Sequence, residues 1–248
     1  MRTVNLIPLA GNSKRFLDKG YLIPKQFIHI NGIPMFIQAA LSLPKADKWI
    51  FVCLEEHYIN FRVNAYVKKF FPNSEIVILK KKTEGQAITC LQVKKYLKKN
   101  DILTIGACDN GMTFDLKKTI KKIKNFDVTI WTFKNKKIIK KNPKMYGYVK
   151  VDSSGIVKDI SCKKILSSHP ENDHAIIGAF TFRKAYFFFK YAKKIINDKK
   201  RINNEFYLDI VAQECFNNQL STTVNLVKKY YCWGTPYHFE NYLNNNKE

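Results

Sequence analysis

The sequence has no apolar run near the roughly 18 residues that a membrane-spanning helix needs, and we expect no signal peptide before its first strand. No Ser-His-Asp or Cys-His nucleophile set is recognisable. The five histidines are far apart and lack the spacing of metal ligands. These absences favour a cytoplasmic protein without a membrane span, a zinc centre or a triad nucleophile.

The cysteines form no C-x-x-C pair, so neither a zinc site nor a redox dithiol is indicated. Most lie inside apolar stretches and are typical of small buried hydrophobic residues. The six are Cys53, Cys90, Cys108, Cys162, Cys215 and Cys232.

Acidic residues are also few, 20 against 43 lysines and arginines, which gives a net charge of +23. An anionic partner would explain this charge, whether nucleic acid, a lipid surface or a nucleotide with a phosphorylated substrate. A general lysine bias explains it as well, since the lysine runs are spread along the chain with many asparagines and little arginine. Nucleic-acid readers concentrate charge on one face, and no helix-turn-helix, RNP or zinc motif is present. We therefore expect no nucleic-acid partner.

What the chain does contain is an alternation of strands and helices in its first half. Its 248 residues are 46% hydrophobic, enough for one large domain spanning residues 1–248. Predicted strands are Val4–Pro8, Trp49–Leu54, Glu75–Leu79, Ile102–Cys108 and Val128–Phe133. Predicted helices are Pro34–Leu43, Glu56–Phe70, Gly85–Leu97 and Leu116–Ile123. The alternation predicts an α/β fold with a doubly wound, mainly parallel, Rossmann-like sheet flanked by helices.

The second half is richer in antiparallel signals. A hairpin is predicted from Tyr146–Val151 to Ile156–Ser161, around the turn Asp152–Gly155. Residues 134–144, rich in lysine and asparagine, are predicted to be flexible. The remaining predicted elements are a strand at Ala175–Phe182, helices at Lys184–Asn197 and Phe206–Asn217, a strand at Thr222–Val227 and a helix at Pro236–Leu243, before a fraying tail at Asn244–Glu248.

Residues 5–25 are the most informative segment. An apolar strand runs into a glycine turn at Gly11, followed by Lys14 and Arg15 and then by Pro24 and Lys25. Backbone amides freed by a turn, with cations beside them, make a pocket for phosphate. The carboxyl end of a strand is also where open α/β sheets bind ligands. We therefore interpret the chain as a nucleotide-handling enzyme.

Five separated blocks carry a resemblance over nearly the whole chain. They are Leu9–Phe16 with Pro24-Lys25 and Asn31–Pro34, Thr83–Ala87, the strand ending at Asp109, Tyr146–Val149 with the hairpin and Ile177-Gly178, and Asn204–Asp209 with Trp233–Pro236. In this order and spacing the chain resembles the sugar-phosphate nucleotidyltransferases, also called nucleoside-diphosphate-sugar pyrophosphorylases. It is most similar to a branch from bacterial capsule and surface-polysaccharide clusters.

The resemblance implies a GT-A type fold and an enzyme that transfers a nucleoside monophosphate from a triphosphate to a sugar phosphate or related phosphorylated acceptor, releasing pyrophosphate. Residues 1–133 would form the nucleotide-binding half and residues 134–248 the acceptor-binding half. Catalytic roles fall to Arg15, Lys25 and Asp109, and nucleotide binding to Leu9, Ala10, Gly11, Glu84, Gly85 and Gln86. Acceptor contacts fall to Tyr146, Gly147, Lys163, Glu205 and Tyr207. Asp109, at the end of a buried strand, would hold Mg²⁺ with the triphosphate.

The chain departs from the family pattern at three places. Asn12 and Ser13 stand where a second glycine is common, so the phosphate loop must be shaped differently or be less tight. Cys232 stands where an aspartate usually gives a second metal ligand, with Asp209 or Glu205 as candidate substitutes. Cys162 precedes Lys163 where a glutamate-lysine pair usually holds the sugar.

Alternatives to the nucleotidyltransferase remain open. A GT-A glycosyltransferase usually needs an Asp-x-Asp metal pair, whereas the strand here ends in Cys108-Asp109-Asn110 with one acidic residue. A catalytically weakened nucleotide-binding protein of the same fold would explain the missing second ligand. The sequence fixes neither the base, nor the acceptor, nor whether the chain forms a homo-oligomer.

Overall fold

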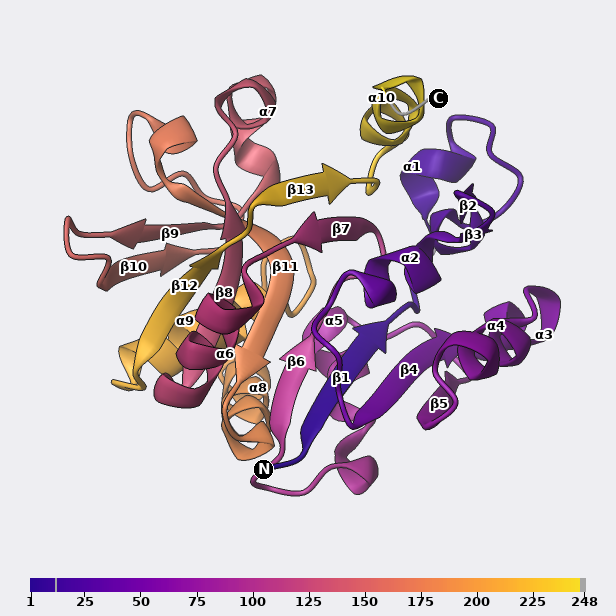
Figure 1. The fold of residues 1–248 in the computed structure, drawn as a ribbon, viewed down its shortest axis with the longest axis horizontal. Coiled ribbons are helices and arrows are strands. Elements are labelled where there is room, and N and C mark those ends of the chain that lie inside the picture. The colour runs from indigo at the N-terminus through magenta and orange to yellow at the C-terminus, as the bar shows by residue number, and fades with distance from the viewer. Residues whose placement is uncertain (12, 246–248) are drawn as a thin grey trace.

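A mixed sheet forms the centre of the molecule, and helices cover both of its faces (Figure 1). The computed structural model describes residues 1–11 and 13–245, and within these residues the sheet has nine strands. Two further ladders of two strands each lie beside it. No helix in these described ranges is long and apolar enough to cross a membrane.

The first half of the chain supplies the parallel part of the sheet. Its strands are β1 (Thr3–Pro8), β4 (Lys48–Leu54), β5 (Ser74–Leu79) and β6 (Ile102–Ile105). They pair in parallel in the order β6-β1-β4-β5, with β1 between β6 and β4. The carboxyl ends of β1 and β6 therefore lie next to each other at one edge of the sheet.

The second half adds most of the antiparallel pairing, which confirms the predicted β-rich portion. The long strand β11 (His174–Phe182) runs antiparallel to β6 and joins the two halves in one sheet. It also pairs with β8 and β9, and β12 extends the sheet parallel to β8. These strands and the hairpin partner of β9 are β8 (Val128–Phe133), β9 (Tyr148–Val151), β10 (Val157–Ser161) and β12 (Thr222–Leu226).

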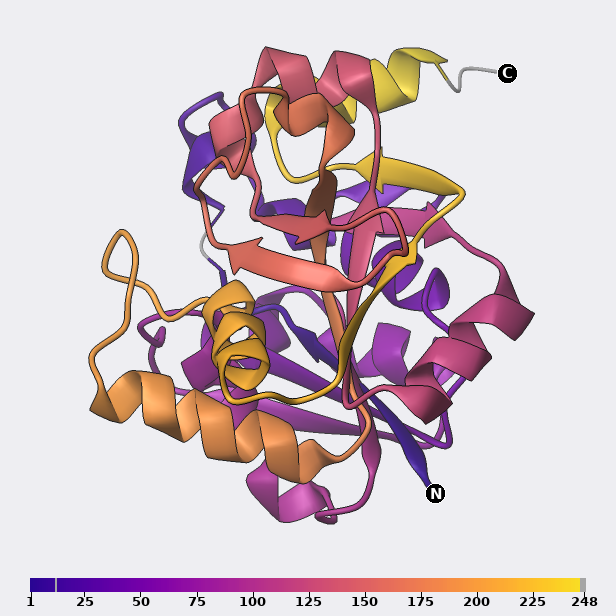
Figure 2. The same ribbon diagram turned by 90° about the vertical axis from the view of Figure 1, so that its left-hand side faces the viewer.

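The two faces of the sheet have separate cores because side chains alternate along a strand. In β4, Ile50 and Val52 face the helices α5 (Gln86–Leu91), α8 (Ala185–Asn197) and α9 (Leu208–Asn217). Trp49, Phe51 and Cys53 face the opposite side, where α2 (Met35–Leu41) and α4 (Val63–Phe70) pack. Figure 2 shows α8 and α9 side by side. A continuous apolar strand is what burial on both faces requires.

A third apolar cluster joins the two ends of the chain. Phe16 on the short helix α1 (Lys14–Leu17) is fully buried and lies 6.1 Å, between ring centroids, from Phe239 on α10 (Pro236–Asn245). The other buried members of this cluster are Ile30, Met35, Ala39 and Trp233. The C-terminal helix therefore lies over the segment that carries Arg15 (Figure 1).

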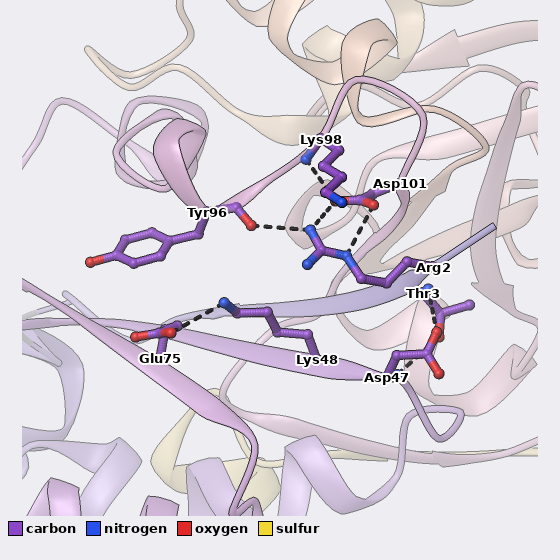
Figure 3. Close-up of polar contacts among 8 residues, drawn as sticks. All are labelled: Arg2, Thr3, Asp47, Lys48, Glu75, Tyr96, Lys98 and Asp101. Atoms are coloured by element: carbon purple, nitrogen blue, oxygen red, sulfur yellow. Dashed lines mark hydrogen bonds and ion pairs between the residues drawn. The ribbon is translucent and has the colours of Figure 1, made fainter.

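A cluster of polar contacts holds the amino ends of the strands, at the opposite end of the sheet (Figure 3). Arg2 donates to both carboxylate oxygens of Asp101, at 3.1 Å from Nε and 2.5 Å from Nη2. The Lys98 amide also donates to Asp101, and the backbone amide and hydroxyl of Thr3 donate to Asp47. These contacts tie the start of β1 to the segments that precede β6 and β4.

Several predicted boundaries are wrong. The helix predicted over Glu56–Phe70 is two helices, α3 (Glu55–Asn60) and α4, because Arg62 takes a left-handed conformation with φ 49°. The helix predicted over Gly85–Leu97 ends at Leu91 and is followed by a 3₁₀ turn at Lys94–Tyr96. The strand predicted over Ile102–Cys108 ends at Ile105.

Other elements are absent from the prediction or differ from it. The stretch predicted to be flexible contains a helix, α7 (Lys136–Lys141), whose first turn is capped by the Asn135 side chain accepting from the Ile138 amide at 3.1 Å. The strands β7 (Asn110–Thr113) and β13 (Lys229–Cys232) pair with each other, and β2 (His29–Ile30) pairs with β3 (Ile33–Pro34). The helix after β7, α6 (Leu116–Asn125), is two residues longer than predicted. Of the predicted fraying tail, residues 244 and 245 are helical and 246–248 lie outside the described residues.

Candidate functional site

The site lies where the neighbouring strands β1 and β6 end. The chain leaves β1 at Pro8, and the Leu9 amide donates to the Val52 carbonyl at 2.8 Å. It leaves β6 at Ile105, and the Gly106 amide donates to the Leu6 carbonyl at 2.9 Å. These backbone bonds carry the parallel register beyond the strands. The two connecting segments, with Gly11 on one and Asp109 on the other, therefore open at the same edge of the sheet.

A first cavity of about 360 Å³ opens at this edge. From the described residues its lining includes Gly11, Ser13 and Arg15 of the N-terminal segment, Gly85 and Gln86 at the start of α5, and Asp109 after β6. A Cβ at Gly11 would meet no atom of the described residues within 4 Å, so this position faces open space among them. The cavity is of a size for a small ligand and carries several cationic side chains.

A second cavity of about 190 Å³ adjoins the first. Arg15, Lys25 and Asp109 line both cavities. The lining of the second cavity alone includes Tyr146, Gly147, Lys163, Asp209 and Cys232. The three residues predicted to be catalytic therefore stand between two adjoining spaces.

Lys25 and Asp109 form an ion pair at this junction. Lys25 Nζ lies 2.5 Å from Asp109 Oδ2 and 3.5 Å from the carbonyl oxygen of Gly234. Burial by itself lowers the pKa of Lys25, but the Asp109 carboxylate and neighbouring groups outweigh it, and the net pKa is raised. Lys25 is therefore held in its charged form.

Gly234 allows the carboxylate to stand where it does. A Cβ at this position would lie 2.8 Å from Asp109 Oδ2. The preceding residue, Trp233, donates its amide to the Asp109 carbonyl at 3.0 Å, so β13 and Asp109 are held together. Cys232, at the end of β13, lines the second cavity, and burial raises the pKa of its thiol.

The second cavity contains a carboxyl group in an unusual environment. Burial raises the pKa of Asp209 to about 6, although the charge of Lys163 opposes this. Asp209 lies directly against Gly147, where a Cβ would overlap its Oδ1 and the Ser161 carbonyl. Among the described residues, Asn110 Oδ1 and Tyr146 Oη are buried and have no hydrogen-bond partner. Both residues belong to the lining of the second cavity.

Lys163 is restrained beside the same cavity. Its backbone is left-handed, with φ 53°, and its ammonium donates to the Met145 carbonyl. The ammonium also lies 5.9 Å from the centroid of the Tyr207 ring. Tyr207 lines both cavities, and Glu205 lines the first.

The start of α5 is bonded to the segment that precedes α9. The Phe206 amide donates to the Glu84 carbonyl at 2.8 Å, and the Ala87 amide donates to the Phe206 carbonyl at 3.0 Å. Between them Gly85 has φ 123°, and a Cβ there would lie 2.5 Å from the Phe206 nitrogen. Only glycine fits this close approach of two backbones.

The structure brings most of the predicted site residues to the two cavities, but not Leu9 and Glu84. The Leu9 side chain is fully buried in the core under α2. The Glu84 carboxylate points to another surface, where it pairs with Arg201 at 3.3 Å. The sequence analysis did not single out Gln26 and Asn110, which also line the cavities. Their positions directly after Lys25 and Asp109 were the signal that could have identified them.

The residues present fit Mg²⁺ bound through a single protein carboxylate. The described residues contain no group of three or more His, Cys, Asp or Glu side chains placed to hold a metal ion. Mg²⁺ is commonly held by one or two carboxylates together with substrate phosphates. Asp109 lines both cavities and is such a carboxylate. The Cys232 thiol is a poor ligand for this hard cation.

The sheet, the glycine-containing segment at the end of β1 and the cationic cavity beside it define an α/β protein of the nucleotide-binding class. The family model described as nucleotidyl transferase matches residues 5–234. The chain belongs to the nucleotidyl transferase family, and the family supports the assignment as an enzyme.

Solved structures share the fold at low sequence identity. A nucleoside-diphosphate-sugar pyrophosphorylase from Vibrio cholerae RC9 superposes with a TM-score of 0.78 at 17% identity, covering 97% of this chain and 99% of that one. The inositol-1-phosphate CTP transferase from T. maritima superposes with a TM-score of 0.70 at 16% identity, covering 96% of this chain and 91% of that one. HddC from Yersinia pseudotuberculosis superposes with a TM-score of 0.65 at 17% identity, covering 100% of both chains. A comparison with curated proteins gives no match.

Proposed function

We propose that this protein transfers a nucleoside monophosphate from a nucleoside triphosphate to a sugar phosphate or a related phosphorylated acceptor, with release of pyrophosphate. The observation that carries the proposal is the pair of adjoining cavities that share Arg15, Lys25 and Asp109. Joining two phosphorylated molecules requires that both be held in line and that their charge be neutralised. A shared cationic wall between two spaces meets that requirement.

In the proposed reaction the acceptor's phosphate oxygen attacks the α-phosphorus of the triphosphate. A new P–O bond forms there, and the bond to the β-phosphate oxygen breaks with pyrophosphate as the leaving group. Lys25, charged and placed at the junction, stabilises the charge that develops on the α-phosphoryl oxygens. Arg15 holds the β- and γ-phosphates, because a guanidinium donates two hydrogen bonds at once. No covalent enzyme intermediate is needed.

Asp109 is the residue that would hold Mg²⁺. When bound, Mg²⁺ supplies neutralisation of triphosphate charge. Because a carboxylate has two oxygens, Asp109 Oδ1 can take this role while Oδ2 stays 2.5 Å from Lys25 Nζ.

The second cavity is proposed to take the acceptor, with Tyr146, Gly147, Lys163 and Tyr207 around it. Sugar and cyclitol phosphates are favoured because the names of two structures of the same fold refer to an NDP-sugar pyrophosphorylase and an inositol-1-phosphate transferase. We further propose that the activated product serves the synthesis of capsular or other surface polysaccharide in the cytoplasm. Under this proposal residues 1–133 mainly bind the nucleotide and residues 134–248 the acceptor, although Glu205, Tyr207 and Gly234 reach the first cavity.

A nucleotide-binding protein with weakened catalysis is the second candidate. It is favoured by Cys232, which lines the second cavity and stands where the family pattern usually has an aspartate as second metal ligand. A glycosyltransferase is disfavoured because the matching family is the nucleotidyl transferases.

Pyrophosphate release tests the proposal. The protein is incubated with Mg²⁺, one nucleoside triphosphate at a time, and a panel of sugar 1-phosphates and other phosphorylated polar molecules. We expect release with one pair, strictly dependent on both substrates. Nucleotide binding without turnover across the panel would instead support the second candidate.

A further inference from the structure

We propose that Ser13 and Gln26 are positioning residues that give the phosphate loop (Leu9, Ala10, Gly11 and Ser13) its shape and thereby set its affinity for the triphosphate. The inference rests on the proposed function for the identity of the ligand. Neither residue is among those to which the family resemblance assigns a role. Both line the first cavity.

Ser13 has a backbone conformation that usually calls for glycine. Its φ of 55° and ψ of 31° are left-handed, although serine has a Cβ. Ser13 also stands immediately before α1, where a serine side chain commonly caps the helix, but its hydroxyl makes no such bond. The hydroxyl is used elsewhere: it donates to Gln26 Oε1 at 2.8 Å and accepts from the Lys25 amide at 2.9 Å.

Gln26 holds the other end of the loop. Its side chain is only 1% exposed, and its Nε2 donates to the Gly11 carbonyl at 2.9 Å and lies 3.3 Å from the Leu9 carbonyl. Nε2 also lies 3.4 Å from Nδ1 of the buried His57. A carbonyl oxygen can only accept, so the amide nitrogen must face Leu9 and Gly11, and Oε1 must face Ser13.

The hydrogen bonds therefore run in one direction, and the peptide bond between Lys25 and Gln26 closes them into a ring. The Lys25 amide donates to Ser13, Ser13 donates to Gln26, and Gln26 donates to Gly11. Because Lys25 and Gln26 are neighbours in sequence, the ring fixes the phosphate loop against the residue that carries the charged Nζ at the junction. Loop shape and Lys25 position are thus set by the same few bonds.

Ring geometry explains how the loop tolerates a serine where a glycine is common. Two side-chain hydrogen bonds compensate a left-handed backbone that costs a non-glycine residue energy. Two variants separate these contributions. Ser13→Gly removes the hydroxyl and relieves the left-handed strain, whereas Ser13→Ala removes the hydroxyl and keeps the strain.

The test compares wild type with Ser13→Gly, Ser13→Ala and Gln26→Met, the last an apolar side chain of similar length. Affinity for inorganic tripolyphosphate is measured by calorimetry, and the exchange rate of the Lys25 amide proton by NMR. We expect Ser13→Gly and Gln26→Met to weaken tripolyphosphate binding about tenfold. The Lys25 amide should exchange faster in both, because its acceptor is lost in Ser13→Gly and is no longer held by Gln26 in Gln26→Met. Ser13→Ala should weaken binding at least as much as Ser13→Gly.

Turnover separates positioning from simple loss of fold. In the variants KM for the triphosphate should rise, while KM for the acceptor and the circular dichroism spectrum stay as in wild type. Wild-type tripolyphosphate affinity in Ser13→Gly and Gln26→Met would overturn the inference, even if the wild-type enzyme releases pyrophosphate. If wild type releases no pyrophosphate with any pair, the proposed function fails, and the calorimetry and amide exchange still decide the role of Ser13 and Gln26.

Discussion

At the scale of single residues, Lys25 and Asp109 form an ion pair where the two cavities meet. Each side chain is about a fifth to a quarter exposed, so the pair is shielded yet open to the cavities. The two charges are 2.5 Å apart and line both spaces. An incoming triphosphate would compete with Asp109 for Lys25, and a divalent cation would compete with Lys25 for Asp109.

Removing either charge should abolish most of the activity without unfolding the protein. Lys25→Ala and Asp109→Ala are each expected to lower kcat about 10²–10³-fold, because electrostatic stabilisation at a reacting phosphate is lost. Steady-state pyrophosphate release measures this. Lys117→Ala, which removes an exposed lysine on α6, is the matched control and should keep wild-type kcat. Wild-type turnover in both site variants would remove the assignment.

Asp209 gives a prediction about pH. Its pKa of about 6 in the folded protein is above the usual 3.8, so the folded state binds the proton more tightly than the unfolded state. The stability that this group contributes is fully present below about pH 4 and is lost as the pH rises through 6, by on the order of 3 kcal/mol. Asp209→Asn should therefore gain stability over wild type between pH 4 and 7.

Urea unfolding at several pH values measures the Asp209 effect. Asp18→Asn, at an exposed position before Gly20, is the control and should show no such gain. A difference between wild type and Asp209→Asn that does not change with pH would contradict the burial of a titrating carboxyl in the second cavity.

At the scale of elements, the start of α5 and the segment before α9 act as one structural piece. Two backbone hydrogen bonds join Glu84 and Ala87 to Phe206, with Gly85 pressed between them. Because Gly85 and Gln86 line the first cavity and Tyr207 lines both, this piece spans the two proposed substrate sites.

Gly85→Ala should separate these two backbones. A methyl group 2.5 Å from the Phe206 nitrogen, at φ 123°, should cost about 1–3 kcal/mol and weaken triphosphate binding. Gly155 provides a matched control, since it also has positive φ, 82°, but its Cβ would meet nothing within 4 Å. Gly155→Ala should lose stability through backbone strain alone and keep wild-type nucleotide affinity. Equal nucleotide affinity in both variants would contradict the role of the Gly85 contact.

The elements also show what the sequence could predict. The strands of the parallel sheet were predicted from continuous apolar runs such as Trp49–Leu54, because burial on both faces leaves a plain signal. The break at Arg62 could not be predicted, because the apolar spacing continues through it. The neighbouring Phe61 stacks on Phe27, far away in the sequence, with ring centroids 4.3 Å apart. The pairing of β7 with β13 joins short segments more than a hundred residues apart and leaves no local pattern.

The candidate site shows the same division. Arg15, Lys25 and Asp109 were predicted because each stands in a motif whose residue types suit phosphate or metal binding. The roles of Ser13 and Gln26 depend on a hydrogen-bond ring that forms only when the chain folds back on itself. The motifs therefore predicted the charged residues of the site, whereas the hydrogen bonds that position them are seen only in the folded chain.

At the scale of the whole molecule, the Arg2–Asp101 pair and the candidate site lie at opposite ends of the sheet. The Arg2–Asp101 pair clamps the amino ends of the strands, with Asp101 only 3% exposed (Figure 3). The cavities open at the carboxyl ends. Because Asp101 lies at the end of the sheet away from the cavities, its loss should lower the stability of the fold and leave activity unchanged.

Asp101→Ala should cost about 3 kcal/mol, because it removes the carboxylate to which the Arg2 guanidinium and the Lys98 amide donate. Thermal unfolding should show a lower Tm, while kcat/KM at 25 °C stays within about twofold. Glu75→Gln, in the more exposed pair with Lys48, is the control and should change stability by less than about 1 kcal/mol. A loss of kcat in Asp101→Ala without a fall in Tm would contradict the separation of the two ends.

The most direct test of the account is a crystal structure of the protein with a non-hydrolysable nucleoside triphosphate analogue and Mg²⁺. We expect the triphosphate to fill the first cavity, with Lys25 Nζ within hydrogen-bond distance of the α-phosphate, Arg15 on the terminal phosphates and Asp109 beside the metal ion. A triphosphate bound away from Lys25 and Asp109 would contradict it.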